Sequence, residues 1–91
     1  MTRQALSGEL SFDTVPELFR TSASWFSGQG ELVIDLAAVT RTDSAGLALL
    51  VEWLRSARAA KRTLRYENIP PQVQTLISVN GLQDALLNQR P

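Results

Sequence analysis

One short apolar segment constrains the fold of this chain more than any other feature. Residues 32–36 read LVIDL, and apart from Asp35 the segment is apolar on both faces of an extended chain. Such a run, bounded by Gly30 and a later polar turn, is typical of a central strand in a parallel sheet that is covered on both sides. We therefore expect a buried central strand here, with Asp35 accepting backbone hydrogen bonds in the neighbouring loop.

Strand and helix patterns alternate along the rest of the chain, which predicts right-handed βαβ units and an α/β fold. The first helix begins with a capping box, because Thr14 precedes Glu17 by three residues. At 91 residues we expect one domain over 1–91, with a core over about 5–82 and a tail over 83–91. The expected segments are a strand over 5–10, a helix over 15–26 with apolar positions Val15, Leu18, Phe19, Ser22 and Phe26, a polar loop over 40–44, a helix over 45–61, a strand over 63–67, a helix that Pro70-Pro71 opens and Asn80-Gly81 ends, and a short turn around 85–87.

The composition excludes most catalytic machinery. The chain has no Cys and no His, which removes disulfides, thiolate metal sites and the commonest general base and metal ligand. We therefore expect no catalytic residue, no metal and no cofactor. The formal net charge is +0, so no global field attracts nucleic acid or an anionic membrane. The first residues carry no targeting signal, and no apolar stretch approaches the roughly 20 residues that span a bilayer, which predicts a cytoplasmic protein without membrane insertion.

A cluster of basic residues lies around the end of the long helix. Cations there complement the helix dipole, and no aromatic stacking set accompanies them, so we interpret the cluster as structural and expect no nucleic-acid partner. Its members are Arg55, Arg58, Lys61, Arg62 and Arg65.

The long helix 45–61 has two apolar sides when it is drawn at about 100° per residue. One side is a core stripe of Leu47, Leu50, Val51 and Leu54, flanked by the stem of Arg58. The opposite side combines a large aromatic residue and a leucine with small residues, which suits a partner-binding face. An alternative is that Trp53 leans sideways onto a neighbouring helix. The opposite side consists of Ala45, Leu49, Glu52, Trp53, Ser56 and Ala60.

The loop before this helix is a second candidate. Either Asp43 or Ser44 is a good N-cap, and capping explains the pair without any further role. The functional alternative is a switch, because a phosphate on Ser44 would add about −1.5 to −2 charge beside the proposed face.

Three segments resemble the STAS family, which includes anti-sigma-factor antagonists and the C-terminal domains of sulfate transporters. They are 6–10 (LSGEL), 33–36 (VIDL) and 42–47 (TDSAGL), and the similarity runs from Ala5 to about Leu82. Within the family, the stretch 41–50 is most similar to the MlaB type, the STAS subunits of Mla phospholipid-transport ABC complexes. Ser11 and Ala45 depart from the family pattern, and Ala45 removes one alternative phosphate acceptor.

The resemblance implies a STAS-like fold, with a small, mixed or mostly parallel sheet, helices packed on it, and few elements at either end. It also implies a non-enzymatic accessory subunit that binds the ATPase of an Mla-type ABC complex in the cytoplasm, peripheral to the inner membrane, through the Asp43-Ser44 loop and helix 45–61. The alternative is an anti-sigma-factor antagonist that a partner kinase phosphorylates at Ser44. The exposed apolar side also predicts self-association without a partner. The expected partner-binding residues are Asp43, Ser44, Ala45, Leu49, Glu52, Trp53 and Ser56.

Overall fold

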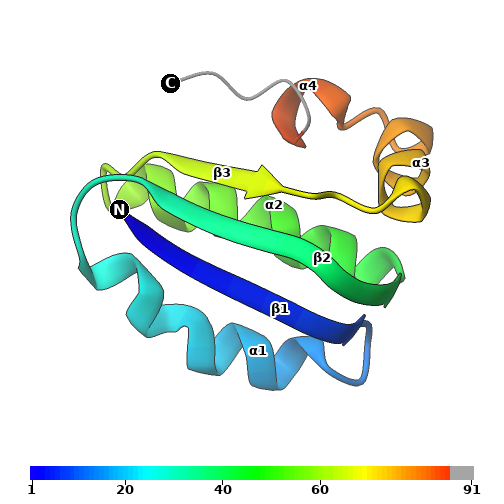
Figure 1. The fold of residues 1–91 in the computed structure, drawn as a ribbon, viewed down its shortest axis with the longest axis horizontal. Helices are drawn as coiled ribbons and strands as arrows, with labels where there is room; N and C mark the ends of the chain where they lie inside the picture. The colour runs from blue at the N-terminus through cyan, green and yellow to red at the C-terminus, as the bar shows by residue number, and fades with distance from the viewer. Residues whose placement is uncertain (87–91) are drawn as a thin grey trace.

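Helices and strands alternate along the chain as predicted (Figure 1). The computed structural model describes residues 1–86, so the predicted tail is covered only over 83–86 and the remainder lies outside the described residues. The elements are β1 (Thr2–Leu10), α1 (Val15–Ser22), the 3₁₀ helix η1 (Ala23–Ser27), β2 (Leu32–Thr42), α2 (Ser44–Ala59), β3 (Leu64–Glu67), α3 (Pro71–Val79) and α4 (Gln83–Leu86).

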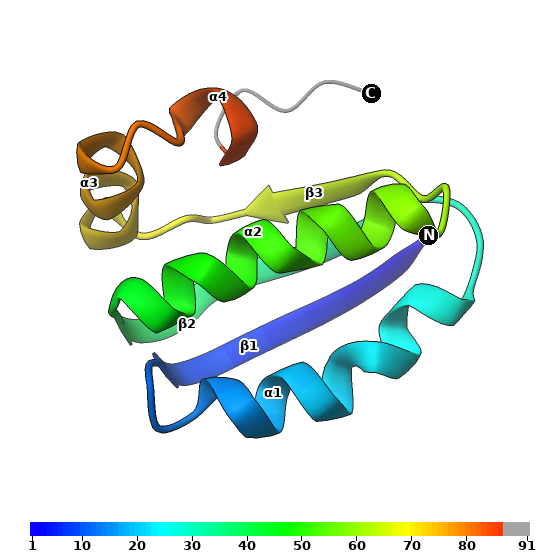
Figure 2. The ribbon, with the colours of Figure 1, turned by 180° about the vertical axis from the view of Figure 1, so that it is seen from behind.

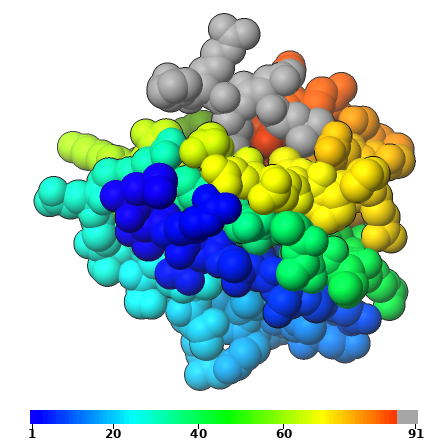
Figure 3. All heavy atoms as spheres, viewed as in Figure 1, coloured from blue at the N-terminus to red at the C-terminus, as the bar shows by residue number. Residues whose placement is uncertain are grey.

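The sheet has three parallel strands in the order β1-β2-β3, which confirms β2 as the central strand. The prediction that both faces of this strand are covered is confirmed for Leu32, Val33 and Ile34, which are fully buried, but α2 covers only one of the two faces. Figure 1 shows the strands in front of α2, and Figure 2 shows α2 in front of the strands, so α2 lies on one face, where α1 contacts it. Side chains of the strands themselves form the opposite surface, which Figure 3 shows.

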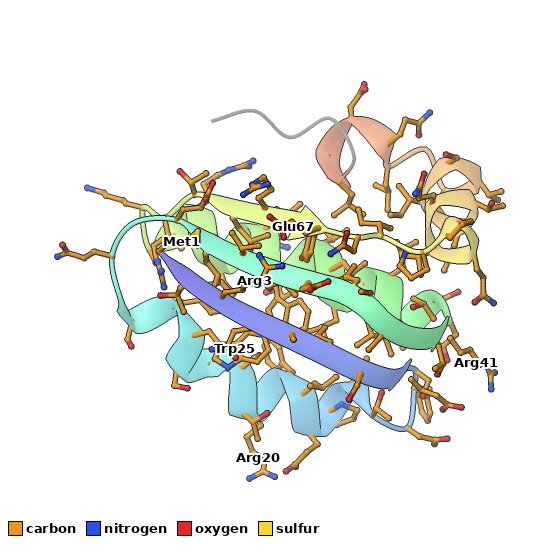
Figure 4. All side chains as sticks on the ribbon, in the orientation of Figure 1. Met1, Arg3, Arg20, Trp25, Arg41 and Glu67 are labelled. Atoms are coloured by element: carbon orange, nitrogen blue, oxygen red, sulfur yellow. The ribbon has the colours of Figure 1, made fainter. Side chains whose placement is uncertain are left out.

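Charged side chains cover that second face. Arg3 and Arg65 flank the fully buried Val33 in the strand register. Arg3 pairs with Asp35 (3.2 Å) and with Glu67 (2.6 Å), and Figure 4 shows Arg3 and Glu67 close together there. Arginine stems can cover apolar surface while their guanidinium groups stay in water, which explains how Val33 is buried without a helix above it.

Two irregularities in β2 explain why this strand is longer than predicted. Ala5 and Ser7 of β1 pair with Asp35 and Ala38, and a second register shift follows Gly8. Each extra residue reverses which side of the strand faces the core. The alternation therefore breaks after residue 36, and the predicted polar loop 40–44 is wrong for 40–42, which belong to β2. The inward-facing, buried residues are Leu32, Ile34, Leu36, Val39 and Thr42.

The first irregularity gives Asp35 its role. Its Oδ1 accepts a hydrogen bond from the backbone N–H of Ala37 (2.9 Å) and another from the side chain of Asn68 (3.0 Å). These bonds, together with Arg3, hold the pKa of Asp35 below its ordinary value. The predicted structural role is confirmed, with the donor in the strand itself.

The predicted capping box at the start of α1 does not form. The Thr14 hydroxyl donates to the carbonyl of Glu9 (2.8 Å) and accepts from the N–H of Ser11 (2.9 Å), while Glu17 pairs with Arg20. Thr14 therefore closes the turn that follows β1, and no side chain caps the N-terminus of α1.

The core lies between the sheet and the helices and includes residues from β1, β2, α2, β3, α3 and α4. The hydroxyl of Tyr66 donates to the carbonyl of Leu50 (2.6 Å), which joins β3 to α2, and burial raises the pKa of Tyr66. Asn80 and Gly81 end α3 as predicted, with Gly81 at φ 69°. Leu86, expected in the tail, is buried in this core.

Candidate partner-binding surface

Asp43 is the N-cap of α2 and connects two segments of the chain. Its Oδ1 accepts from the backbone N–H groups of Ala45 (2.9 Å) and Gly46 (3.1 Å), and its Oδ2 accepts from the N–H of Phe12 (3.0 Å). The bonds from Phe12 and Gly46 lower the pKa of Asp43 most strongly. Of the two predicted caps, the structure therefore selects Asp43, and the cap attaches the loop after β1 to the start of α2.

Gly46 brings the first turn of α2 close to the end of β1. A Cβ atom on Gly46 would lie 2.1 Å from the carbonyl oxygen of Leu10, a distance that no side chain can occupy. The close approach holds the preceding residue pair in place. Ser44, the first residue of α2, is exposed, and no side-chain hydrogen bond to it occurs within residues 1–86. Ser44 is therefore exposed at the start of a helix that packs closely against the end of β1.

The prediction that Leu49 and Trp53 lie on an outer face of α2 is wrong. Their exposed fractions are 2% and 1%. The indole N–H of Trp53 donates to the hydroxyl of Ser22 at the end of α1 (2.9 Å), and its ring centroid lies 5.4 Å from that of Trp25 in η1. The alternative, that Trp53 leans onto a neighbouring helix, is confirmed.

The reason is the width of the buried arc of α2. The sheet covers one flank of this helix, and α1 with η1 covers the adjacent flank, so Leu49 and Trp53 are buried as well as Leu47 and Leu50. The predicted core stripe was therefore partly wrong. Val51 and Leu54, which were assigned to it, are only partly buried. The exposed stripe that remains contains Ser44, Ala48, Arg55, Arg58 and Ala59.

The structure thus divides the seven predicted partner-binding residues. Asp43, Ser44 and Ala45 lie together at the start of α2, and Glu52 and Ser56 are partly exposed along it. Glu52 lies 3.8 Å from Arg55, three residues later. Leu49 and Trp53 belong to the core.

Two exposed aromatic residues were missed. Phe12, beside the Asp43 cap, is 78% exposed, and Phe19 on α1 is 52% exposed. The prediction placed Phe19 in the apolar stripe of the first helix. Leu18 and Ser22, four residues apart, already form the inward side of that helix. Phe19 is therefore one apolar residue more than the inward side can bury. Counting the residues that the stripe needs would have identified it.

Two residues of the basic cluster, Arg62 and Arg65, make interactions that stabilise the fold. Arg62 is buried and donates to the carbonyls of Trp25, Gln29 and Gly30 and to the hydroxyl of Thr2. Arg65 pairs with Glu31, the residue before β2 (3.5 Å), and with Glu67 on its own strand β3 (3.1 Å). The structural interpretation of the cluster therefore holds for these two side chains, although Arg62 lies beyond α2 and so does not act on its dipole.

Comparisons with known proteins agree with this architecture. A family model described as "Mlab, STAS domain" matches residues 2–88. A search of curated proteins finds no match. Among solved structures, the anti-sigma factor antagonist SpoIIAA in its unphosphorylated form superposes with a TM-score of 0.71 at 20% identity, covering 90% of this chain and 76% of that chain. That likeness shows the fold. Within residues 1–86, no helix has the length and apolar character needed to cross a membrane.

Proposed function

Because the chain belongs to the MlaB-type STAS domain family, we propose that it is a non-enzymatic accessory subunit of an Mla-type phospholipid-transport ABC complex. In this proposal it binds the cytoplasmic ATPase of the complex, supports its assembly and activity, and is thereby held at the inner membrane. The observation that carries the proposal is the family match over residues 2–88.

The proposed docking surface surrounds the start of α2. Ser44 offers an exposed hydroxyl at a helix N-terminus, where the dipole favours a hydrogen-bond acceptor from the partner. Ala48, one turn later, is exposed and small, so a partner backbone can approach closely. Phe12 supplies the exposed aromatic group that interfaces commonly use as an anchor. Ala45 and the partly exposed Glu52 complete the surface.

A second candidate function is that of an anti-sigma-factor antagonist whose kinase partner phosphorylates Ser44. SpoIIAA, whose unphosphorylated form superposes on this chain, is an antagonist of this class. An exposed Ser44 at the start of α2 supports a modification there, since a kinase needs access to the hydroxyl. The two functions use the same surface and differ in the partner.

Purification of the tagged protein from its native host tests the proposal. We expect an ABC-transporter ATPase to be retained in stoichiometric amount, and Ser44→Asp to weaken binding of the purified ATPase at least tenfold by introducing a charge at the contact. Ser44→Ala should weaken it less. Ser78→Asp places the same charge on the exposed side of α3 and is the matched control. Retention of a serine kinase together with phosphorylated Ser44 would favour the antagonist function instead.

A further inference from the structure

A pocket opens between α1–η1 and α2, beside the buried Trp53. Its volume is about 490 Å³, which falls within the range of about 300–1,000 Å³ found for small-molecule sites. Phe19, Ala23 and Phe26 line it from α1 and η1, and Trp53 and Ser56 line it from α2. The pocket is therefore built from α1, η1 and α2, and α1 and α2 contact each other.

The interior of this pocket suits an apolar chain. Three aromatic residues line it, and two of its polar groups, on Trp53 and Ser22, are already paired within the protein. The indole N–H of Trp53 donates to the Ser22 hydroxyl (2.9 Å), and that hydroxyl donates in turn to the carbonyl of Phe19 (3.2 Å). A ligand that enters here gains apolar contact without having to supply hydrogen bonds in the interior.

The lining also contains a charged residue. Arg20 is the one charged residue among the described residues that line it. Figure 4 shows the Arg20 side chain extending outward from α1 into solvent, where 73% of it is exposed. Its pairing with Glu17 is solvent-exposed on both sides, and exposed pairs of this kind are weak and easily rearranged. The Ser56 hydroxyl lines the α2 side. The lining thus combines one cationic residue and a serine hydroxyl with apolar and aromatic residues.

We propose that this pocket binds a medium-chain fatty acid, with the acyl chain between Phe19, Phe26 and Trp53 and the carboxylate at Arg20. The volume accommodates a flexible chain, and the sign of the charge in the lining selects an anionic headgroup. The site is separate from Ser44 and does not depend on the identity of the protein partner.

Titration with octanoate, decanoate and dodecanoate, each below its micelle concentration, tests the chain-length dependence. We expect saturable binding by calorimetry, with a Kd that falls about threefold to fourfold per added methylene until the pocket is full. Decanol should bind more weakly than decanoate. Trp53 lines the pocket, so a brominated decanoate should quench the tryptophan fluorescence in parallel with binding. Absence of saturable binding by all three acids would overturn the proposal.

Variants separate the two parts of the site. Ser56→Phe should abolish decanoate binding by filling the pocket, and Ala23→Leu serves the same purpose if the first variant does not fold by circular dichroism. Arg20→Gln should weaken decanoate binding about tenfold and leave decanol unchanged. Arg55→Gln is the matched control, because Arg55 is as exposed as Arg20 (75% and 73% of the side chain) and also pairs with a glutamate three residues earlier. Equal losses for Arg20→Gln and Arg55→Gln would show nonspecific electrostatics and contradict the site.

The same variants distinguish this proposal from the proposed function. Ser44→Asp should lose the ATPase and keep decanoate binding. If Ser56→Phe blocks the ATPase while the wild-type protein binds no fatty acid, the pocket receives a side chain of the protein partner, which refutes the fatty-acid site and leaves the proposed function standing.

Discussion

Gly46 lies where the first turn of α2 crosses the end of β1, and there is no room for a side chain at this position. In Gly46→Ala the new Cβ would meet the backbone carbonyl of Leu10, which cannot move without breaking the end of the strand. We expect the free energy of unfolding, measured by urea denaturation, to fall by about 1–3 kcal/mol or more. Gly28→Ala is the control, because the Cβ there would only touch the end of the Arg62 side chain at 3.4 Å. A Gly46→Ala protein as stable as this control would refute the close approach.

Asp43 should make stability depend on pH in the acid range. Its backbone hydrogen bonds lower its pKa in the folded protein below the ordinary value of 3.8. A carboxyl group with a depressed folded pKa contributes stability above its unfolded pKa, and this contribution is lost as pH falls through the folded pKa. The native protein should therefore lose stability progressively below about pH 4.

The variant Asp43→Asn tests this assignment, since an amide keeps one acceptor oxygen and does not titrate. Urea denaturation at pH 7, 4 and 2.5 should show a stability difference between native protein and variant that is largest at pH 7 and shrinks with acid. Asp13→Asn, at an exposed carboxylate, provides the baseline. A difference that stays constant with pH would show that charge at Asp43 does not stabilise the cap.

At the scale of elements, α2 is held from two sides, and Trp53 makes the second contact. Trp53→Ala removes the largest fully buried side chain and leaves a cavity between α1, η1 and α2. We expect a loss of about 3–5 kcal/mol in the free energy of unfolding. Trp53→Phe keeps most of the volume but leaves the Ser22 hydroxyl without its donor, so its loss should be smaller.

Phe12→Ala is the comparison for this prediction, because Phe12 is aromatic and exposed. Its effect on stability should stay within about 0.5 kcal/mol. If urea denaturation gave Trp53→Ala and Phe12→Ala the same midpoint, the placement of Trp53 in the core would be wrong.

At the scale of the whole molecule, one hydrophobic cluster connects residues from β1 to α4. Small domains with a single core usually unfold in one cooperative step. Trp25 and Trp53 report on the contact between η1 and α2, whereas far-ultraviolet circular dichroism reports on all helices. We expect the two signals to give the same urea midpoint. A fluorescence transition at clearly lower urea would show that α1 and η1 detach before the rest unfolds.

The order of strands and helices, the central position of β2, the cap at Asp43 and the end of α3 at Asn80-Gly81 were all predictable. The cap and the helix end depend on interactions between neighbouring residues, such as a carboxylate that accepts from the first turn of its own helix. The central position of β2 was predictable because the run 32–36 is apolar on both faces. The DSAGL motif at 43–47 also indicated the family, because its residues are adjacent in the chain.

Contacts between distant segments decided the rest. A helical pattern determines the angles between side chains around α2, but only the position of α1 determined that Trp53 is buried against Ser22, thirty-one residues away. Arg62 appeared to be one surface cation among five, until the chain brought the carbonyls of Trp25 and Gly30 to its guanidinium. Whether an apolar or charged side chain faces water depends on which other segment packs against it, and that is a property of the tertiary structure.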